Sequence, residues 1–167
     1  LMPNHFHFVL WPLEDGDLGR WMHWLMTSHV RRHHVMHGTQ GHVWQGPYKA
    51  FPIQEDKHFL TVMRYVERNP LRAGLVERAE EWPWSSLASR DVPGPPGLNV
   101  AGPVDLPAEW LDYVNQPQTP SEVESVRASV HRGAPYGGQT WVEETAVRLG
   151  LESTLRRRGR PAREQPN

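Results

Sequence analysis

Two histidines near the start of the chain have the types and the spacing to act on one metal ion or one phosphate group. His5 and His7 lie in the segment Pro3-Asn4-His5-Phe6-His7-Phe8-Val9-Leu10-Trp11. If this segment is a β-strand, its period of two places both imidazoles on one face and most of the apolar side chains on the other. Side chains two positions apart on one strand face lie roughly 7 Å from each other and can converge on one ion. The chain has 10 histidines, so a merely polar strand face is the alternative explanation.

A tyrosine and an asparagine one helical turn apart form the second candidate group. A helix is predicted from Glu55-Asp56 to Asn69-Pro70, where proline disfavours continuation. Tyr65 and Asn69 lie on the flank of its apolar stripe, which consists of Phe59, Val62, Met63 and Val66. A phenol can attack phosphorus while an amide oxygen and two imidazoles hold a divalent ion that polarises the phosphodiester. Taken singly, each residue also has a structural explanation, as a half-buried tyrosine and as a residue that ends a helix.

Composition excludes several other kinds of site. The chain has 167 residues, a formal net charge of -1 and no cysteine. Disulfide frameworks, thiol nucleophiles and thiolate zinc sites are therefore excluded. No apolar run reaches the roughly 20 residues that cross a bilayer, so a soluble chain without a membrane partner is predicted. The length fits one medium domain plus a tail.

Helix and linker signals predict how the chain is divided. Asp17 is a suitable N-cap for a helix that Gly38 closes. Two capping-box spacings, Ser121 with Glu124 and Thr140 with Glu143, predict helices over about 121–131 and 140–149. The Pro/Gly-rich stretch 91–103 predicts a linker. We therefore expect a catalytic domain over 1–90, a linker over 91–103 and a helical extension with a basic tail over 104–167.

Three segments together resemble a known family. Met2-Pro3-Asn4-His5-Phe6-His7, Val43-Trp44-Gln45-Gly46 and Arg64-Tyr65-Val66-Glu67-Arg68-Asn69-Pro70-Leu71-Arg72-Ala73-Gly74-Leu75-Val76 resemble the single-tyrosine HUH transposases, in particular their REP-associated tyrosine transposase branch. The likeness runs from about residue 1 to 86. It implies an α/β (α+β) fold of HUH or ferredoxin-like type, with a small antiparallel sheet, flanking helices and a helical, Arg-rich C-terminal extension. Relatives carry several dozen residues before the histidine strand, so it also implies a domain that is incomplete at its N-terminus.

The resemblance also implies a reaction and a set of roles. His5 and His7, with Asn69 as third ligand, would hold Mg²⁺ or Mn²⁺, and Tyr65 would be the nucleophile that forms a 5′-phosphotyrosine link. Family members cut and rejoin single-stranded DNA that folds into hairpins, during transposition. A cytoplasmic, nucleoid-associated bacterial protein is therefore expected. No oligomeric state is predicted.

Basic residues outside this group are candidates for DNA contact. Arg158-Gly159-Arg160-Pro161 resembles the core of an AT-hook, in which two arginines enter the minor groove of A·T-rich DNA. An ordinary basic tail is the alternative. Arg31, Arg32 and Lys49 are candidates for phosphate contact, or simply for a solvated face. Two other functions stay open, a DNA-binding remnant without catalysis and a metal-dependent phosphodiester hydrolase.

Overall fold

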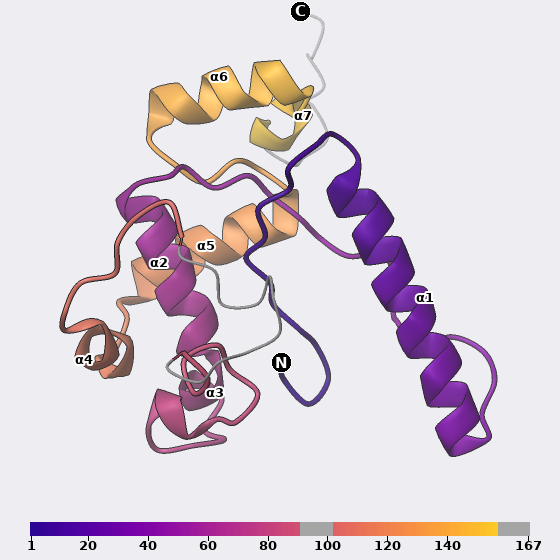
Figure 1. The fold of residues 1–167 in the computed structure, drawn as a ribbon. Helices are drawn as coiled ribbons and strands as arrows, with labels where there is room; N and C mark the ends of the chain where they lie inside the picture. The colour runs from indigo at the N-terminus through magenta and orange to yellow at the C-terminus, as the bar shows by residue number, and fades with distance from the viewer. Residues whose placement is uncertain (91–101, 157–167) are drawn as a thin grey trace, which may run out of the picture. The chain divides into compact units, whose positions relative to one another are not determined.

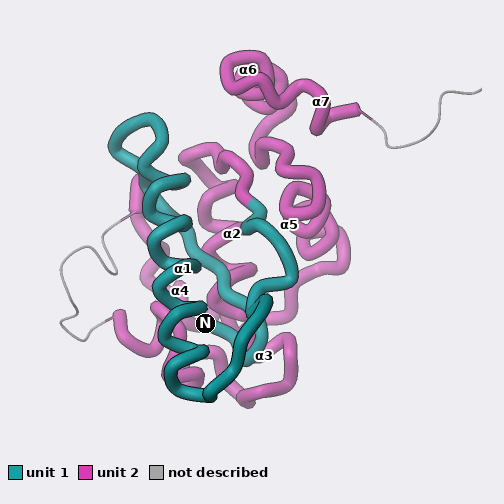
Figure 2. The backbone as a smooth tube through the Cα atoms, turned by 90° about the vertical axis from the view of Figure 1, so that its right-hand side faces the viewer, with its two compact units in different colours: residues 1–49 teal, residues 50–167 magenta. Residues whose placement is uncertain are grey.

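The described part of the chain consists of helices joined by irregular segments. The computed structural model describes residues 1–90 and 102–156. They divide into two compact units, Leu1–Lys49 and Ala50–Asn167, which are coloured separately in Figure 2 and are described one at a time here. The helices are α1 (Asp17–His37), α2 (Lys57–Glu67), α3 (Asn69–Arg72), the 3₁₀ helix η1 (Ala79–Glu81), α4 (Trp110–Asn115), α5 (Pro120–Arg132), α6 (Gln139–Leu149) and α7 (Glu152–Leu155) (Figure 1).

The expected antiparallel sheet is absent from the described residues, so the prediction of an α/β fold was wrong. The histidine segment, residues 3–11, is neither strand nor helix. Ile53 and Tyr136 form one isolated parallel bridge, with hydrogen bonds from Gln54 N to Tyr136 O at 2.9 Å and from Tyr136 N to Pro52 O at 2.8 Å. A strand forms only where a neighbouring strand accepts and donates its backbone hydrogen bonds. Alternating side chains predict a face but do not supply that neighbour.

In the first unit, α1 ends where the sequence predicts and begins with a different cap. Gly38 adopts the left-handed conformation (φ 62°) and its N–H donates to His34 O, which closes the last turn. The N-cap is Gly16 rather than Asp17, and no side chain caps the helix. Asp17 is instead the first helical residue, where its carboxylate accepts the Glu14 N–H at 2.9 Å. Within residues 1–90 and 102–156, no helix combines the length and the apolar character needed to span a membrane.

In the second unit, α2 and α3 follow each other directly. Asp56 is the N-cap of α2, and its side chain accepts the His58 N–H at 2.8 Å. Proline does not end the helical region as expected, because α2 already ends at Glu67 and Pro70 lies in the first turn of α3. Proline is tolerated there since the N–H groups of a first turn have no partner within the helix. The helical region is interrupted at Arg68, so α3 is a separate short helix that follows the one carrying Tyr65, the candidate nucleophile.

The core of the second unit joins residues on both sides of the Pro/Gly-rich stretch. α2 packs against α4 and α5, and α3 packs against η1. A central cluster of buried residues consists of Ala79, Leu87, Trp110 and Val114, and Leu60, Met63, Leu71, Leu106 and Tyr113 pack around it. Residues 91–101 lie outside the described part, so the division into 1–90, 91–103 and 104–167 stays a prediction.

The two helices expected after the linker are present, although other residues cap them. The capping box of α5 is formed by Thr119 and Glu122, not by Ser121 and Glu124. Thr119 Oγ1 accepts the Glu122 N–H at 3.2 Å, and Glu122 Oε2 accepts the Thr119 N–H at 2.7 Å. α6 begins after Gly138, which has no side chain to cap it, and ends at Gly150 in the left-handed conformation (φ 67°). The position of Pro120 at the start of α5 favours the earlier box.

We expect Thr119→Ala to lower the free energy of unfolding by about 1 kcal/mol, because it removes the cap of α5. Ser121→Ala is the matched control in the same turn, and it should change stability by less than about 0.5 kcal/mol, since Ser121 is exposed and caps nothing. Urea unfolding followed by circular dichroism measures both. A larger loss for Ser121→Ala would contradict the assignment of the cap.

Candidate functional site

His5 and His7 lie side by side in the first unit even without a strand. Their ring centroids are 5.1 Å apart and the rings are nearly perpendicular, at 85°. The rings of Phe6 and Phe8 are likewise paired, with centroids 4.9 Å apart. The His5 Nδ1 lies 2.7 Å from Asn4 Oδ1. His5 is thus adjacent to His7, and Phe6 to Phe8, as side chains two positions apart are in an extended segment.

Tyr65 and Asn69 lie together in the second unit, and both are buried. Tyr65 is 7% exposed and Asn69 is 8% exposed. A third residue, which the sequence analysis did not select, contacts both. The Arg72 guanidinium carbon lies 4.2 Å from the centroid of the Tyr65 ring, and Arg72 Nη2 donates a hydrogen bond of 2.5 Å to Asn69 Oδ1. Arg72 follows Asn69 by three residues and Tyr65 by seven, and residues at these spacings lie on one face of a helix. This spacing was the sequence signal that could have identified Arg72.

Arg72 is half-buried among neutral acceptors and other cations. Its Nη1 donates to Gln118 Oε1 at 3.2 Å. Burial lowers the pKa of Arg72, and the positive charges of Arg127 and Arg68 lower it further, while interaction with Tyr65 opposes this. Among the described residues, Arg72 forms no ion pair with a carboxylate. Its positive charge is therefore not neutralised by a side chain of the described chain.

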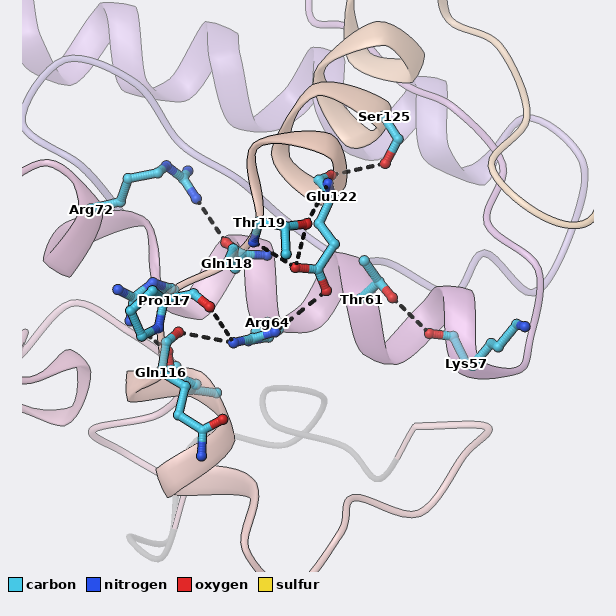
Figure 3. Close-up of polar contacts among 12 residues, drawn as sticks. Lys57, Thr61, Arg64, Arg72, Gln116, Pro117, Gln118, Thr119, Glu122 and Ser125 are labelled. Carbon is cyan, nitrogen blue, oxygen red and sulfur yellow. Dashed lines mark hydrogen bonds and ion pairs between the residues drawn. The ribbon is translucent and has the colours of Figure 1, made fainter.

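Two further arginines on the same helical face have a structural role. Arg64 Nη2 donates to Gln116 O at 2.9 Å and to Pro117 O at 3.2 Å, as Figure 3 shows. Arg68 Nη1 donates to the carbonyl oxygens of Val114 and Asn115, at 2.9 and 2.5 Å. The last carbonyls of α4 have no partner within the helix, so these guanidinium groups cap its C-terminus. Arg64 and Arg68 thereby attach α4 to α2.

A buried carboxylate holds α2, and with it Tyr65, in the core. Glu67 is 0% exposed. It accepts a hydrogen bond of 2.7 Å from Trp110 Nε1 and one of 2.9 Å from Ser86 Oγ, and it is paired with Arg90. Burial of a carboxylate is tolerated only when donors and a countercharge surround it, as they do here. Glu67 lies two residues after Tyr65, so these contacts also position the candidate nucleophile.

The remaining predicted contacts with DNA are exposed or lie outside the described residues. Arg31 and Arg32 are exposed on α1, and Lys49 is exposed at the end of the first unit. Arg158 and Arg160 lie outside the described residues. DNA contact by all five residues stays a prediction.

One of three comparisons with known proteins found a relative, and its name agrees with the resemblance to REP-associated tyrosine transposases. No protein-family profile and no solved structure matches the chain. A protein of Haemophilus influenzae named "Putative REP-associated tyrosine transposase" is 25% identical over 124 residues, which cover 62% of this chain and 69% of that relative. The chain is thus distantly similar to a transposase-like protein.

The expected ligand set for Mg²⁺ or Mn²⁺ fits the structure only in part. Two adjacent imidazoles suit Mn²⁺ better than Mg²⁺, which prefers oxygen ligands. The amide oxygen of Asn69 already accepts the Arg72 guanidinium, and a metal ion at that oxygen would face a like charge. No cluster of three or more histidine, cysteine or acidic side chains suited to a metal ion occurs in the described part of the chain. A metal ion at Asn69 would thus require Arg72 to leave its oxygen, and the metal with its ligands His5, His7 and Asn69 stays a prediction.

Proposed function

We propose that this chain is a transposase-like DNA strand transferase that cleaves and rejoins single-stranded, hairpin-forming DNA, with Tyr65 as the nucleophile. The contact of the Arg72 guanidinium with both Tyr65 and Asn69 is the observation that carries the proposal. A fixed positive charge beside a phenol is what attack on a phosphodiester needs, because negative charge develops on the phosphate oxygens. The distant similarity to a relative named as a tyrosine transposase supports the same assignment.

The proposed reaction exchanges one phosphoester bond for another. The Tyr65 phenol oxygen attacks phosphorus and loses its proton to solvent. A bond between phosphorus and the tyrosine oxygen forms, the bond to the 3′ oxygen of the preceding nucleotide breaks, and that oxygen leaves as a hydroxyl after taking up a proton. The enzyme then carries a 5′-phosphotyrosine, and attack by a 3′ hydroxyl reverses the step and rejoins the strand. Because the bond type is conserved, rejoining needs no external energy source.

A mass spectrum of the intact chain after incubation with labelled hairpin DNA and manganese tests the proposal. The expected result is a species heavier by the mass of the cleaved 3′ fragment, with the modification mapped to Tyr65 after proteolysis. Absence of this species from a folded sample that binds the DNA would contradict strand transfer. An adduct on a different tyrosine would retain the reaction and reject Tyr65 as the nucleophile.

The burial of the tyrosine favours one second candidate function, DNA binding without cleavage. Tyr65 is 7% exposed and Arg72 lies over its ring. A scissile phosphate must therefore displace part of this cover before it reaches the phenol. The same experiment separates the candidates, since a DNA-binding remnant shifts the hairpin in a gel and forms no adduct. Release of a cut strand without an adduct would instead select the metal-dependent hydrolase.

A further inference from the structure

Among the described residues, Arg72 donates to neutral amide oxygens and lies over the Tyr65 ring. Its two nitrogen contacts are with amide oxygens, Asn69 Oδ1 at 2.5 Å and Gln118 Oε1 at 3.2 Å, and Figure 3 shows the contact with Gln118. Hydrogen bonds from a guanidinium to a phosphate oxygen are roughly twice as strong as those to neutral acceptors. An incoming phosphate therefore competes well for this side chain.

The neighbouring glutamine has an unused donor. Because Gln118 Oε1 accepts from Arg72, its amide nitrogen faces away from the guanidinium, and this Nε2 is buried without a hydrogen-bond partner among the described residues. A buried N–H without an acceptor is unfavourable and uncommon in folded proteins, and Arg64 Nε is another case in the described part of the chain. An anion bound next to Arg72 would bring a hydrogen-bond acceptor close to the Gln118 side chain, whose Nε2 lacks one.

We propose that Arg72, with Gln118 beside it, binds a phosphate group of single-stranded DNA next to Tyr65. The identity of the ligand rests on the proposed function, whereas the site itself rests on these side chains. In this role Arg72 is a positioning residue, since it would hold the phosphate while the phenol of Tyr65 attacks. Its departure from Asn69 Oδ1 would also release that oxygen when DNA binds.

Salt-dependent DNA binding tests the site separately from catalysis. Fluorescence anisotropy with a labelled single-stranded oligonucleotide is recorded over a series of NaCl concentrations, with Tyr65→Phe as the background so that no adduct forms. Each lost phosphate contact should reduce the slope of log K against log salt by about 0.7. Arg72→Gln should reduce the slope by that amount and the affinity about tenfold. Arg148→Gln, an exposed arginine on α6, is the matched control for charge and should leave the slope unchanged.

The outcomes separate this inference from the proposed function. An unchanged slope for a folded Arg72→Gln chain overturns the phosphate site, even if the wild-type chain forms the tyrosine adduct. A reduced slope supports the site, even if the wild type forms no adduct, in which case strand transfer alone is rejected. If Arg72→Gln does not fold, Gln118→Glu decides in the same way, because a carboxylate beside Arg72 would pair with the guanidinium and compete with the phosphate. Failure of the Tyr65→Phe chain to bind single-stranded DNA also overturns the site.

Discussion

Tyr65→Phe is expected to reduce formation of the covalent DNA adduct below detection, while binding of the hairpin stays unchanged. The substitution removes only the phenol oxygen, which is the proposed nucleophile. It keeps the ring that packs under Arg72 with a distance of 4.2 Å between the guanidinium carbon and the ring centroid. The adduct is measured by mass spectrometry of the intact chain, and hairpin binding by gel shift.

Tyr113→Phe is the matched control for this substitution. Tyr113 also lies beneath a guanidinium, with the Arg64 carbon 3.9 Å from its ring centroid. Each of the two tyrosines therefore makes a cation–π contact with its own arginine. They differ because the arginine over Tyr65 also bonds to an asparagine one turn from that tyrosine. Tyr113→Phe should form the adduct at the wild-type rate. An adduct on Tyr65→Phe, or its loss in Tyr113→Phe, would show that the nucleophile has been assigned to the wrong residue.

The largest expected effect on stability belongs to Glu67. Glu67→Ala should lower the free energy of unfolding by about 2–4 kcal/mol, because it leaves a cavity in the core and buried donors without an acceptor. The Trp110 indole N–H and the Ser86 hydroxyl would lose their acceptor as well. Urea unfolding followed by tryptophan fluorescence reports the change, since Trp110 is in the core.

Two further variants make the Glu67 prediction specific. Glu124→Ala removes an exposed carboxylate on α5 and should change the free energy of unfolding by less than about 0.5 kcal/mol. Glu67→Gln keeps the size and one acceptor oxygen, so we expect a smaller loss than for alanine. Equal stability of Glu67→Ala and Glu124→Ala would contradict a structural role for the buried carboxylate.

Local signals in the sequence were sufficient to place the longer described helices, α1, α2, α5 and α6, but not the short ones. The end of α1 at Gly38, the start of α2 after Asp56 and the end of α6 at Gly150 depend on residues within one helical turn of each boundary. Such signals act between near neighbours, so they can be read without knowledge of the fold. The sequence did not identify the residue that caps α5, because Thr119 and Ser121 are both of a type suited to an N-cap. The backbone around Pro120 distinguishes them in the structure.

Residues far apart in the sequence decided the fold class. The alternating segment around His5 and His7 had the composition of a strand, and it remained irregular because no described strand pairs with it. The paired rings of His5 and His7 nevertheless follow from sequence spacing, since neighbouring side chains in a non-helical segment alternate in direction. Strand formation therefore depended on a partner that the segment itself does not specify.

The sequence by itself determined that Tyr65 and Asn69 lie about one turn apart, because Arg68 between α2 and α3 keeps right-handed helical backbone angles. Only the tertiary structure decided what surrounds them. Arg72 meets Gln118, Arg68 meets the end of α4, and Glu67 meets Trp110 across separations of more than 40 residues. Local patterns do not encode such contacts, because they exist only after α2, α4 and α5 pack around one core. The three arginines of this face look equivalent in sequence, and their different acceptors make two of them structural and the third a candidate for phosphate binding.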